Sequence, residues 1–108
     1  MTQDVMVGEI ERTGGDYAMR VLREAELEDG RAEVKVRAIR RIMGSENPLT
    51  AKAHSASSAE AVVETDDEYR QYRDEQRTAT VLKIRAGAKY ESARARARLA
   101  AGMVEVLP

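Results

Sequence analysis

The chain of 108 residues contains no cysteine, no phenylalanine and no tryptophan, and it has only two prolines. Without cysteine it forms no disulfide and offers no thiolate ligand to a metal. Its four tyrosines are its only aromatic residues, so a large apolar core is not expected. The apolar side chains are otherwise aliphatic, a set that suits narrow seams between helices. Because a monomer with so thin a core would be marginally stable, we expect self-association.

Long apolar runs are also missing. No segment approaches the roughly 18 apolar residues that a membrane-spanning helix needs. The first ten residues lack the basic and apolar regions of a signal peptide. We therefore expect a cytoplasmic protein that makes no membrane contact.

What the chain does have is charge, arranged in four blocks of alternating sign. The net charges are −4 over residues 9–29, +4 over 31–43, −5 over 58–75 and +6 over 77–98, which the total of −1 conceals. If an acidic-then-basic helix folds back on a second one, each acidic half meets a basic half. The pattern predicts two long antiparallel helices.

The first predicted helix covers about 16–43. Asp16 follows a Gly14-Gly15 pair and is a typical N-cap, while Gly44 and Pro48 end the pattern. Apolar residues then recur at steps of three and four, with one polar exception. The predicted seam is Ala18, Leu22, Ala25, Asp29, Ala32, Val36, Ile39 and Met43. An alternative for 23–38 is a β-hairpin around Asp29-Gly30, which is a strong type I′ turn signal.

Residues 44–57 form a polar connector, after which a second helix is predicted over about 58–101. Ser57 and Glu60 have the spacing of a capping box. Three-four spacing then continues without proline. The seam is Val62, Thr65, Tyr69, Tyr72, Gln76, Ala79, Lys83, Ala86, Tyr90, Ala93, Ala97 and Ala100. Residues 103–108 alternate, as in a short strand or a frayed tail.

The resulting prediction is an all-α, self-associating helical hairpin over 16–108, preceded by an N-terminal extension, 1–15. The second helix is longer than the first, at about 66 Å against about 42 Å. Part of it must therefore be covered by another subunit or by residues 1–15. Gly87, inside the second helix, predicts either the close approach of a neighbouring backbone or a bend.

No residue pattern indicates an enzyme, a cofactor or a metal site. His54 is the only histidine and lies in the polar connector without recognisable partners, so we expect it to be exposed. The acids at 64–68 fan around the helix axis and cannot converge on one ion. We expect them to interact with the helix dipole and with the basic end of the first helix.

Basic residues are the strongest functional candidates, because clustered arginine and lysine can neutralise phosphates. The candidates are Arg40, Arg41, Lys52, Lys89, Arg94, Arg96 and Arg98. The alternative is that these bases pair with the acidic halves of the helices. Tyr69, Tyr72 and Tyr90 lie on the predicted seam, which favours a role in the core over base stacking.

Four stretches carry a resemblance to a known group. RAIRRIMGSENP ends the first helix, and after the connector LTAKAHSAS the acidic AEAVVETDDEYRQYRDE leads to KYESARARARLAAG. This layout resembles small phage-encoded two-helix proteins and is similar to the UvsY-type recombination mediators. The mediators carry an aromatic-rich segment before the connector, where this chain has Ile39, Ile42 and Met43.

The resemblance implies a homo-oligomer in the host cytoplasm that binds single-stranded DNA. Its further partners would be a recombinase or a single-strand binding protein, and Arg40, Arg41 and Lys52 would contact the DNA. We therefore expect a non-enzymatic accessory protein of DNA recombination. The alternative is a structural or interaction protein, such as a virion assembly component or an inhibitor of a host protein, that does not bind DNA.

Overall fold

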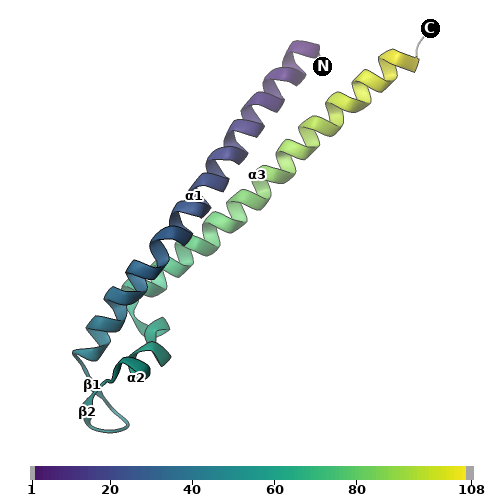
Figure 1. Ribbon diagram of the computed structural model, residues 1–108. Coiled ribbons are helices and arrows are strands. Elements are labelled where there is room, and N and C mark those ends of the chain that lie inside the picture. Colours follow the sequence, from purple (N-terminus) through teal and green to yellow (C-terminus); the bar gives the residue numbers. More distant parts are fainter. Residues whose placement is uncertain (1, 107–108) are drawn as a thin grey trace. The chain divides into compact units, whose positions relative to one another are not determined.

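The computed structural model describes residues 2–106, with side chains to residue 102, and shows an all-α chain dominated by two long helices (Figure 1). The elements in chain order are α1 (Gln3–Met43), β1 (Glu46–Asn47), β2 (Lys52–Ala53), α2 (Ala56–Ala61), the 3₁₀ turn η1 (Val63–Thr65) and α3 (Asp67–Val106). The predicted helical hairpin is confirmed, but α1 begins earlier than predicted, and α3 both begins and ends later than predicted.

Helix α1 begins at Gln3, so the N-cap predicted at Asp16 is wrong. The amide of Val5 instead donates to the Thr2 hydroxyl at 3.3 Å. Gly14 and Gly15 lie inside the helix, where each costs about 1 kcal/mol relative to alanine. The helix also runs unbroken through residues 23–38, which excludes the β-hairpin alternative.

The seam predicted for the first helix is wrong as well. Of its eight residues only Ile39 is partly buried, and the other seven are exposed. The face that packs against α3 carries Tyr17, Glu24, Leu27, Val34 and Ala38. Packing therefore selects a more polar face of α1 and leaves the more aliphatic face uncovered.

The second predicted helix is broken near its start. Ser55, not Ser57, caps α2, because its hydroxyl accepts from the Ser58 amide at 3.1 Å. After η1, Asp66 adopts an extended conformation and its carboxylate accepts from the Tyr69 amide at 3.0 Å, which starts α3. The capping box predicted at Ser57 is therefore wrong, because Ser55 is the N-cap. The predicted seam positions Val62 and Thr65 are also wrong, because the side chains of these two residues are exposed.

Helix α3 reaches Val106, so residues 103–106 are helical and do not form a strand; residues 107–108 lie outside the described part of the chain. Each seam residue predicted in α3 from Tyr69 to Ala100 is buried or half-buried. The three-four spacing of the second helix is confirmed over this length.

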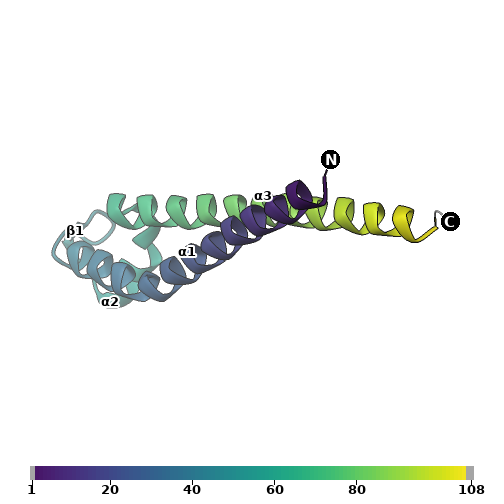
Figure 2. The same cartoon turned by 90° about the horizontal axis from the view of Figure 1, so that it is seen from above.

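The connector contains a small β-hairpin that the sequence did not reveal. Glu46 pairs with Ala53 and Asn47 with Lys52 in antiparallel register. The Leu49 amide donates to the Asn47 side chain at 3.0 Å, and Ala51 has a left-handed φ of 56°. In the view from above, the hairpin and α2 lie beside the C-terminal end of α1 (Figure 2).

The chain divides into two compact units. The terminal unit comprises residues 1–24 and 79–108, and the connector unit comprises residues 25–78. Helices α1 and α3 contribute to both units, and each unit has its own packing.

The connector unit contains the larger core. Val34, Ala38, Val63 and Tyr69 form a buried cluster, and Tyr72 packs beside it. The Tyr72 hydroxyl donates to the carbonyl oxygen of Leu27 at 2.5 Å. This core joins the second half of α1 to the 3₁₀ turn and to the start of α3.

The terminal unit buries little beyond three alanines, Ala79, Ala86 and Ala93. Two tyrosines pack on glycines of the opposite helix in a reciprocal arrangement. A Cβ on Gly14 would lie 3.0 Å from Tyr90 Cε1, and one on Gly87 would lie 3.3 Å from Tyr17 Cε1. Gly87 therefore permits the close approach of a tyrosine side chain, where the sequence predicted that of a backbone. These contacts also show that residues before Asp16 cover α3, which was one of the two expected ways to cover it.

Candidate nucleic-acid interface

Ion pairs connect the basic end of α1 to the acidic segment that follows the connector. Arg41 lies 2.6 Å from Asp66 and 3.0 Å from Glu68, while Arg37 lies 2.8 Å from Glu68. The Arg41 hydrogen bond holds the pKa of Asp66 below its usual value, and the Arg37 hydrogen bond does the same for Glu68. Asp66 and Glu68 thus pair with the basic end of the first helix, as the sequence predicted.

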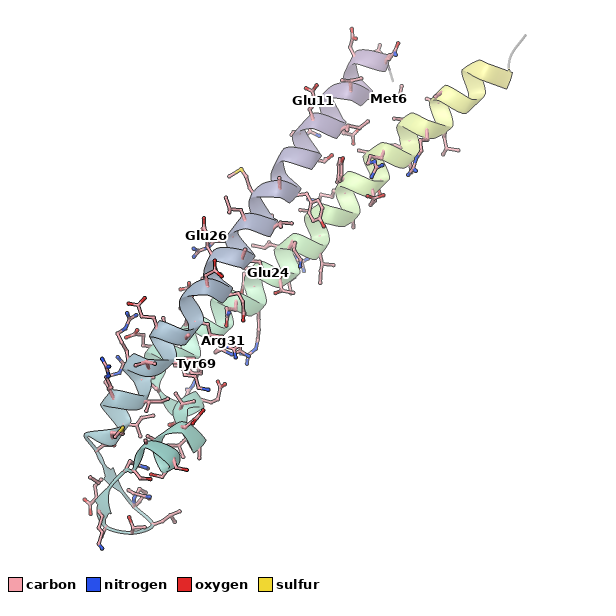
Figure 3. The ribbon with its side chains drawn as sticks, viewed as in Figure 1. Met6, Glu11, Glu24, Glu26, Arg31 and Tyr69 are labelled. Carbon is pink, nitrogen blue, oxygen red and sulfur yellow. The ribbon has the colours of Figure 1, made fainter. Side chains whose placement is uncertain are left out.

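The terminal unit pairs the opposite halves of the charge pattern. Glu24 accepts from Lys83 Nζ and from the Thr80 hydroxyl, both at 2.7 Å, and it lies on the side of α1 that faces α3 (Figure 3). The Lys83 hydrogen bond is the largest cause of the lowered pKa of Glu24. Glu9 accepts from Arg96. The expected pairing of acidic with basic helix halves is therefore present within each unit.

Three of the predicted binding residues belong to the connector unit. The guanidinium of Arg41 is engaged by Asp66 and Glu68, and these hydrogen bonds raise its pKa. Arg40 and Lys52 are exposed, and neither has an ion-pair partner among the residues described. The structure therefore leaves two of these three cations accessible to a ligand.

The other four predicted residues belong to the terminal unit and do not share one face. Arg94 lies 3.2 Å from Glu91 and 5.4 Å from the centre of the Tyr90 ring. Arg98 is exposed and has no ion-pair partner within the described part of the chain. Lys89 and Arg96 lie together on a different side of α3, where they line a groove.

This groove, of about 360 Å³, lies between α1 and α3 of the terminal unit. Its polar lining residues are Glu9, Arg12, Thr13, Lys89, Ser92 and Arg96, and Ala88 completes it. Three cations thus surround one carboxylate, which Arg96 already engages. The Ser92 hydroxyl adds a neutral hydrogen-bond donor, whereas the Thr13 hydroxyl already donates to the carbonyl oxygen of Glu9 at 2.7 Å. A site with this composition suits a phosphate group, which accepts hydrogen bonds and carries negative charge.

The sequence did not identify Arg12 as a candidate. Arg12 lies within the acidic block 9–29, where the net charge of the block conceals it. Only the antiparallel register of the two helices brings it to the same groove as Lys89. The charge blocks indicate which halves of the two helices meet, but they do not determine which residue of α1 lies opposite which residue of α3.

A second groove of about 510 Å³ in the terminal unit is apolar. Ile10, Gly14, Tyr17, Val21 and Tyr90 are among its lining residues. The rings of Tyr17 and Tyr90 have centroids 6.1 Å apart and are inclined by 30°. Both tyrosines are half-buried, so they contribute to the helix contact and also present ring surface to the groove.

The described residues contain no assembled metal site. No three His, Asp or Glu side chains lie close enough there to hold a metal ion. His54, expected to be exposed, is partly buried, with Nδ1 3.0 Å from the Ser58 hydroxyl. None of the described helices has both the length and the apolar character needed to cross a membrane.

Comparison with known proteins finds no matching family model, no matching curated protein and no matching solved structure. The resemblance to phage recombination mediators therefore stays a prediction from the layout of the sequence.

Proposed function

We propose that this chain is a non-enzymatic accessory protein that binds single-stranded DNA through the basic groove of its terminal unit. The observation that carries the proposal is that Arg12 of α1 and Lys89 of α3 line one groove together with Arg96. Neither Arg12 nor Lys89 has an ion-pair partner among the residues described. A self-associated protein would offer one such groove per copy. Because phosphate groups repeat along a strand, several of these grooves would bind the same strand.

The basic residues predicted from the sequence differ in whether they are accessible to DNA. Lys89 and Arg96 belong to the groove, and Arg98, Arg40 and Lys52 are exposed cations that could extend the contact. Arg41 and Arg94 lie outside the groove and are held by carboxylates at 3.0 and 3.2 Å, whereas the carboxylate that holds Arg96, that of Glu9, itself lines the groove. We therefore place Arg12 in the binding set and remove Arg41 and Arg94 from it.

Fluorescence anisotropy with a labelled single-stranded oligonucleotide tests the proposal over a series of salt concentrations. The expected result is binding that weakens steeply with salt, since each phosphate contact releases a counterion. Replacing Arg12 or Lys89 with glutamine should weaken binding and reduce the salt slope by about one for each contact that is lost.

Arg77→Gln is the matched control, because it removes the same charge from an exposed arginine of α3 outside the groove. If Arg77→Gln weakens binding as much as Lys89→Gln does, the DNA is attracted by overall charge rather than held in the groove. The absence of binding at about 50 mM salt would contradict the proposal, since phosphate contacts are strong at that concentration.

In the form that the resemblance implies, the DNA-bound oligomer would help to load a recombinase onto strands coated by a single-strand binding protein. The second candidate function is that of a structural or interaction protein without DNA affinity. It is favoured by one observation: large apolar side chains such as Leu22, Ile84 and Leu99 are exposed in the terminal unit. The same anisotropy measurement separates the two functions.

A further inference from the structure

The terminal unit leaves most of its larger apolar side chains uncovered. Of twelve large apolar side chains that are exposed in the described part of the chain, eight belong to this unit. They are Val5, Val7, Met19, Val21, Leu22, Val81, Ile84 and Leu99. The residues that the unit does bury are alanines, and these remove little apolar area from water. Because helices in water depend on packing for their stability, this unit is incompletely covered.

One uncovered stripe follows α1, and we define the α1 stripe as Val7, Ala18 and Leu22. Leu22 lies two residues before Glu24, which faces α3, and two residues correspond to about 200° around the helix. Accordingly Leu22 is 60% exposed. Ala18 and Leu22 belong to the aliphatic face that the sequence wrongly assigned to the contact between the two helices.

A second uncovered stripe follows α3. Most of it lies on the side away from α1, and Ala88 lies where the stripe meets the edge of the basic groove. The α3 stripe consists of Val81, Ile84, Ala88, Ala95 and Leu99. Val81, Ala88 and Ala95 each follow a buried alanine by two residues, which again corresponds to about 200° around the helix. Ile84 is 62% exposed and Leu99 69% exposed.

The charges that border the two stripes have opposite signs. Asp4 and Glu11 border the α1 stripe, and Glu11 points away from α3 (Figure 3). Arg85 and Arg98 border the α3 stripe. Glu91 borders it too but is held by Arg94 at 3.2 Å. Asp4, Glu11, Arg85 and Arg98 form no ion pair with any residue that the structure describes, so their charges are available to a neighbour.

We propose that a second copy of this chain packs its α3 stripe against the α1 stripe of the first copy. This contact joins apolar surface to apolar surface and brings acidic borders to basic borders. A contact between two α1 stripes would oppose acids to acids, and one between two α3 stripes would oppose bases to bases. Because the two contacting surfaces differ, copies join head to tail, and the assembly either closes into a ring or continues as a filament.

The proposal does not depend on nucleic-acid binding, and it makes a specific prediction about mixtures. The first variant carries Val7→Gln and Leu22→Gln, and the second carries Ile84→Gln and Leu99→Gln. Glutamine keeps the helix propensity of these exposed positions while removing the apolar contact. Each variant alone should have the mass of a single chain in light scattering, because one side of every contact is lost.

An equimolar mixture of the two variants should form a dimer and nothing larger. The intact α3 stripe of the first variant then meets the intact α1 stripe of the second, and the remaining stripes are blocked. Leu49→Gln, a change of an exposed leucine in the connector hairpin, should assemble like the unaltered chain. Circular dichroism of every variant shows whether the helices are retained.

Thiol cross-linking gives a second readout that does not require apolar residues to be removed. The chain has no cysteine of its own, so Ala18→Cys and Ala95→Cys each introduce a single thiol. A short bis-maleimide should join the two variants in a mixture much more efficiently than it joins either variant to itself. A monomeric unaltered chain, assembly by either glutamine variant alone, or equal self-linking of one cysteine variant would each overturn the proposal.

Discussion

Gly30 lies so close to Tyr72 that a Cβ at residue 30 would stand 2.5 Å from the tyrosine hydroxyl oxygen. That oxygen cannot move away freely, because it donates to the carbonyl oxygen of Leu27 at 2.5 Å. The contact fixes which face of α1 meets α3 in the connector unit. It also makes glycine the residue that this position of the helix requires.

Gly30→Ala should therefore lower the free energy of unfolding, even though alanine is the better helix former. The overpacking penalty of about 1–3 kcal/mol exceeds the gain in helix propensity of about 1 kcal/mol. Urea denaturation followed by circular dichroism measures the difference. Gly15→Ala is the matched control, since a Cβ there meets no atom within 4 Å and should stabilise the chain by about 1 kcal/mol.

Tyr72→Phe should cost about 1 kcal/mol, because the Leu27 carbonyl loses the hydroxyl donor and keeps only the more distant Gln76 Nε2, at 3.5 Å, as a partner from α3. The same change removes the atom that obstructs a Cβ at residue 30. The double variant Gly30→Ala with Tyr72→Phe should therefore be more stable than the sum of the two single changes indicates. Additive losses would show that the hydroxyl is not what excludes alanine.

Acid should destabilise the connector unit through Asp66 and Glu68. The folded-state pKa values of both carboxyl groups lie below their usual values, chiefly because of hydrogen bonds from Arg41 and Arg37 respectively. As the pH falls through the ordinary carboxyl range near pH 4, the unfolded state takes up protons first, so stability declines. The side chain of Asp66 is only 11% exposed, which limits screening of its ion pair by salt.

Arg41→Gln should reduce this pH dependence, because Asp66 then loses the hydrogen bond that lowers its pKa. The measurement is the melting temperature between pH 7 and pH 3 for the unaltered chain and for the variant. Arg70→Gln serves as a comparison, since Arg70 contacts the Thr65 carbonyl rather than a carboxylate. An unchanged slope in Arg41→Gln would exclude the Asp66 pair as its cause.

Glu24 and Lys83 form a polar pair on the helix contact of the terminal unit, where each side chain is 30% exposed. Polar pairs at such positions specify register at some cost in stability. Replacing both with leucine should raise the melting temperature, while Lys83→Leu alone should lower it because Glu24 keeps only Thr80 as a partner. A fall in melting temperature for the double variant would show that the pair is a net source of stability.

Ala51 adopts a left-handed backbone conformation, with φ of 56°, in the connector hairpin. An L-residue with a Cβ loses roughly 1–2 kcal/mol there relative to its usual conformations, and glycine does not. Ala51→Gly should therefore stabilise the chain by about 1 kcal/mol. Ala53→Gly, in the neighbouring strand, should instead destabilise it because glycine loses more backbone entropy on folding.

The sequence predicted the fold where its pattern was unambiguous. In the second helix only one face has three-four spacing from Tyr69 to Ala100, and that face is buried. The first helix has two faces that could form the contact with the second helix, and the sequence pattern favours the more aliphatic one, which carries Leu22 and Val36. The structure packs the other face, because tyrosines fit on Gly14 and Gly30 of α1. Complementarity of this kind belongs to two segments jointly and leaves no periodic signal in either.

The break before α3 and the basic groove escaped prediction for similar reasons. Helix-forming residues surround Val62–Asp66, and the chain departs from a helix there because Val63 enters the core and Asp66 pairs with Arg41. Arg12 was hidden inside an acidic block. The break and the groove both depend on which residues contact each other across the hairpin, and the net charge of each block does not contain this information.

The sequence separation of the contacts has a consequence for the order of folding. Lys35 and Glu60, in the connector unit, are 25 residues apart, whereas Thr80 and Glu24 are 56 apart and Arg96 and Glu9 are 87 apart. Closing a short loop costs less entropy than closing a long one, and the connector unit also holds the larger apolar cluster. The two helices should therefore join first beside the connector and zip toward the chain ends, so that the terminal unit is the last to form and the first to open.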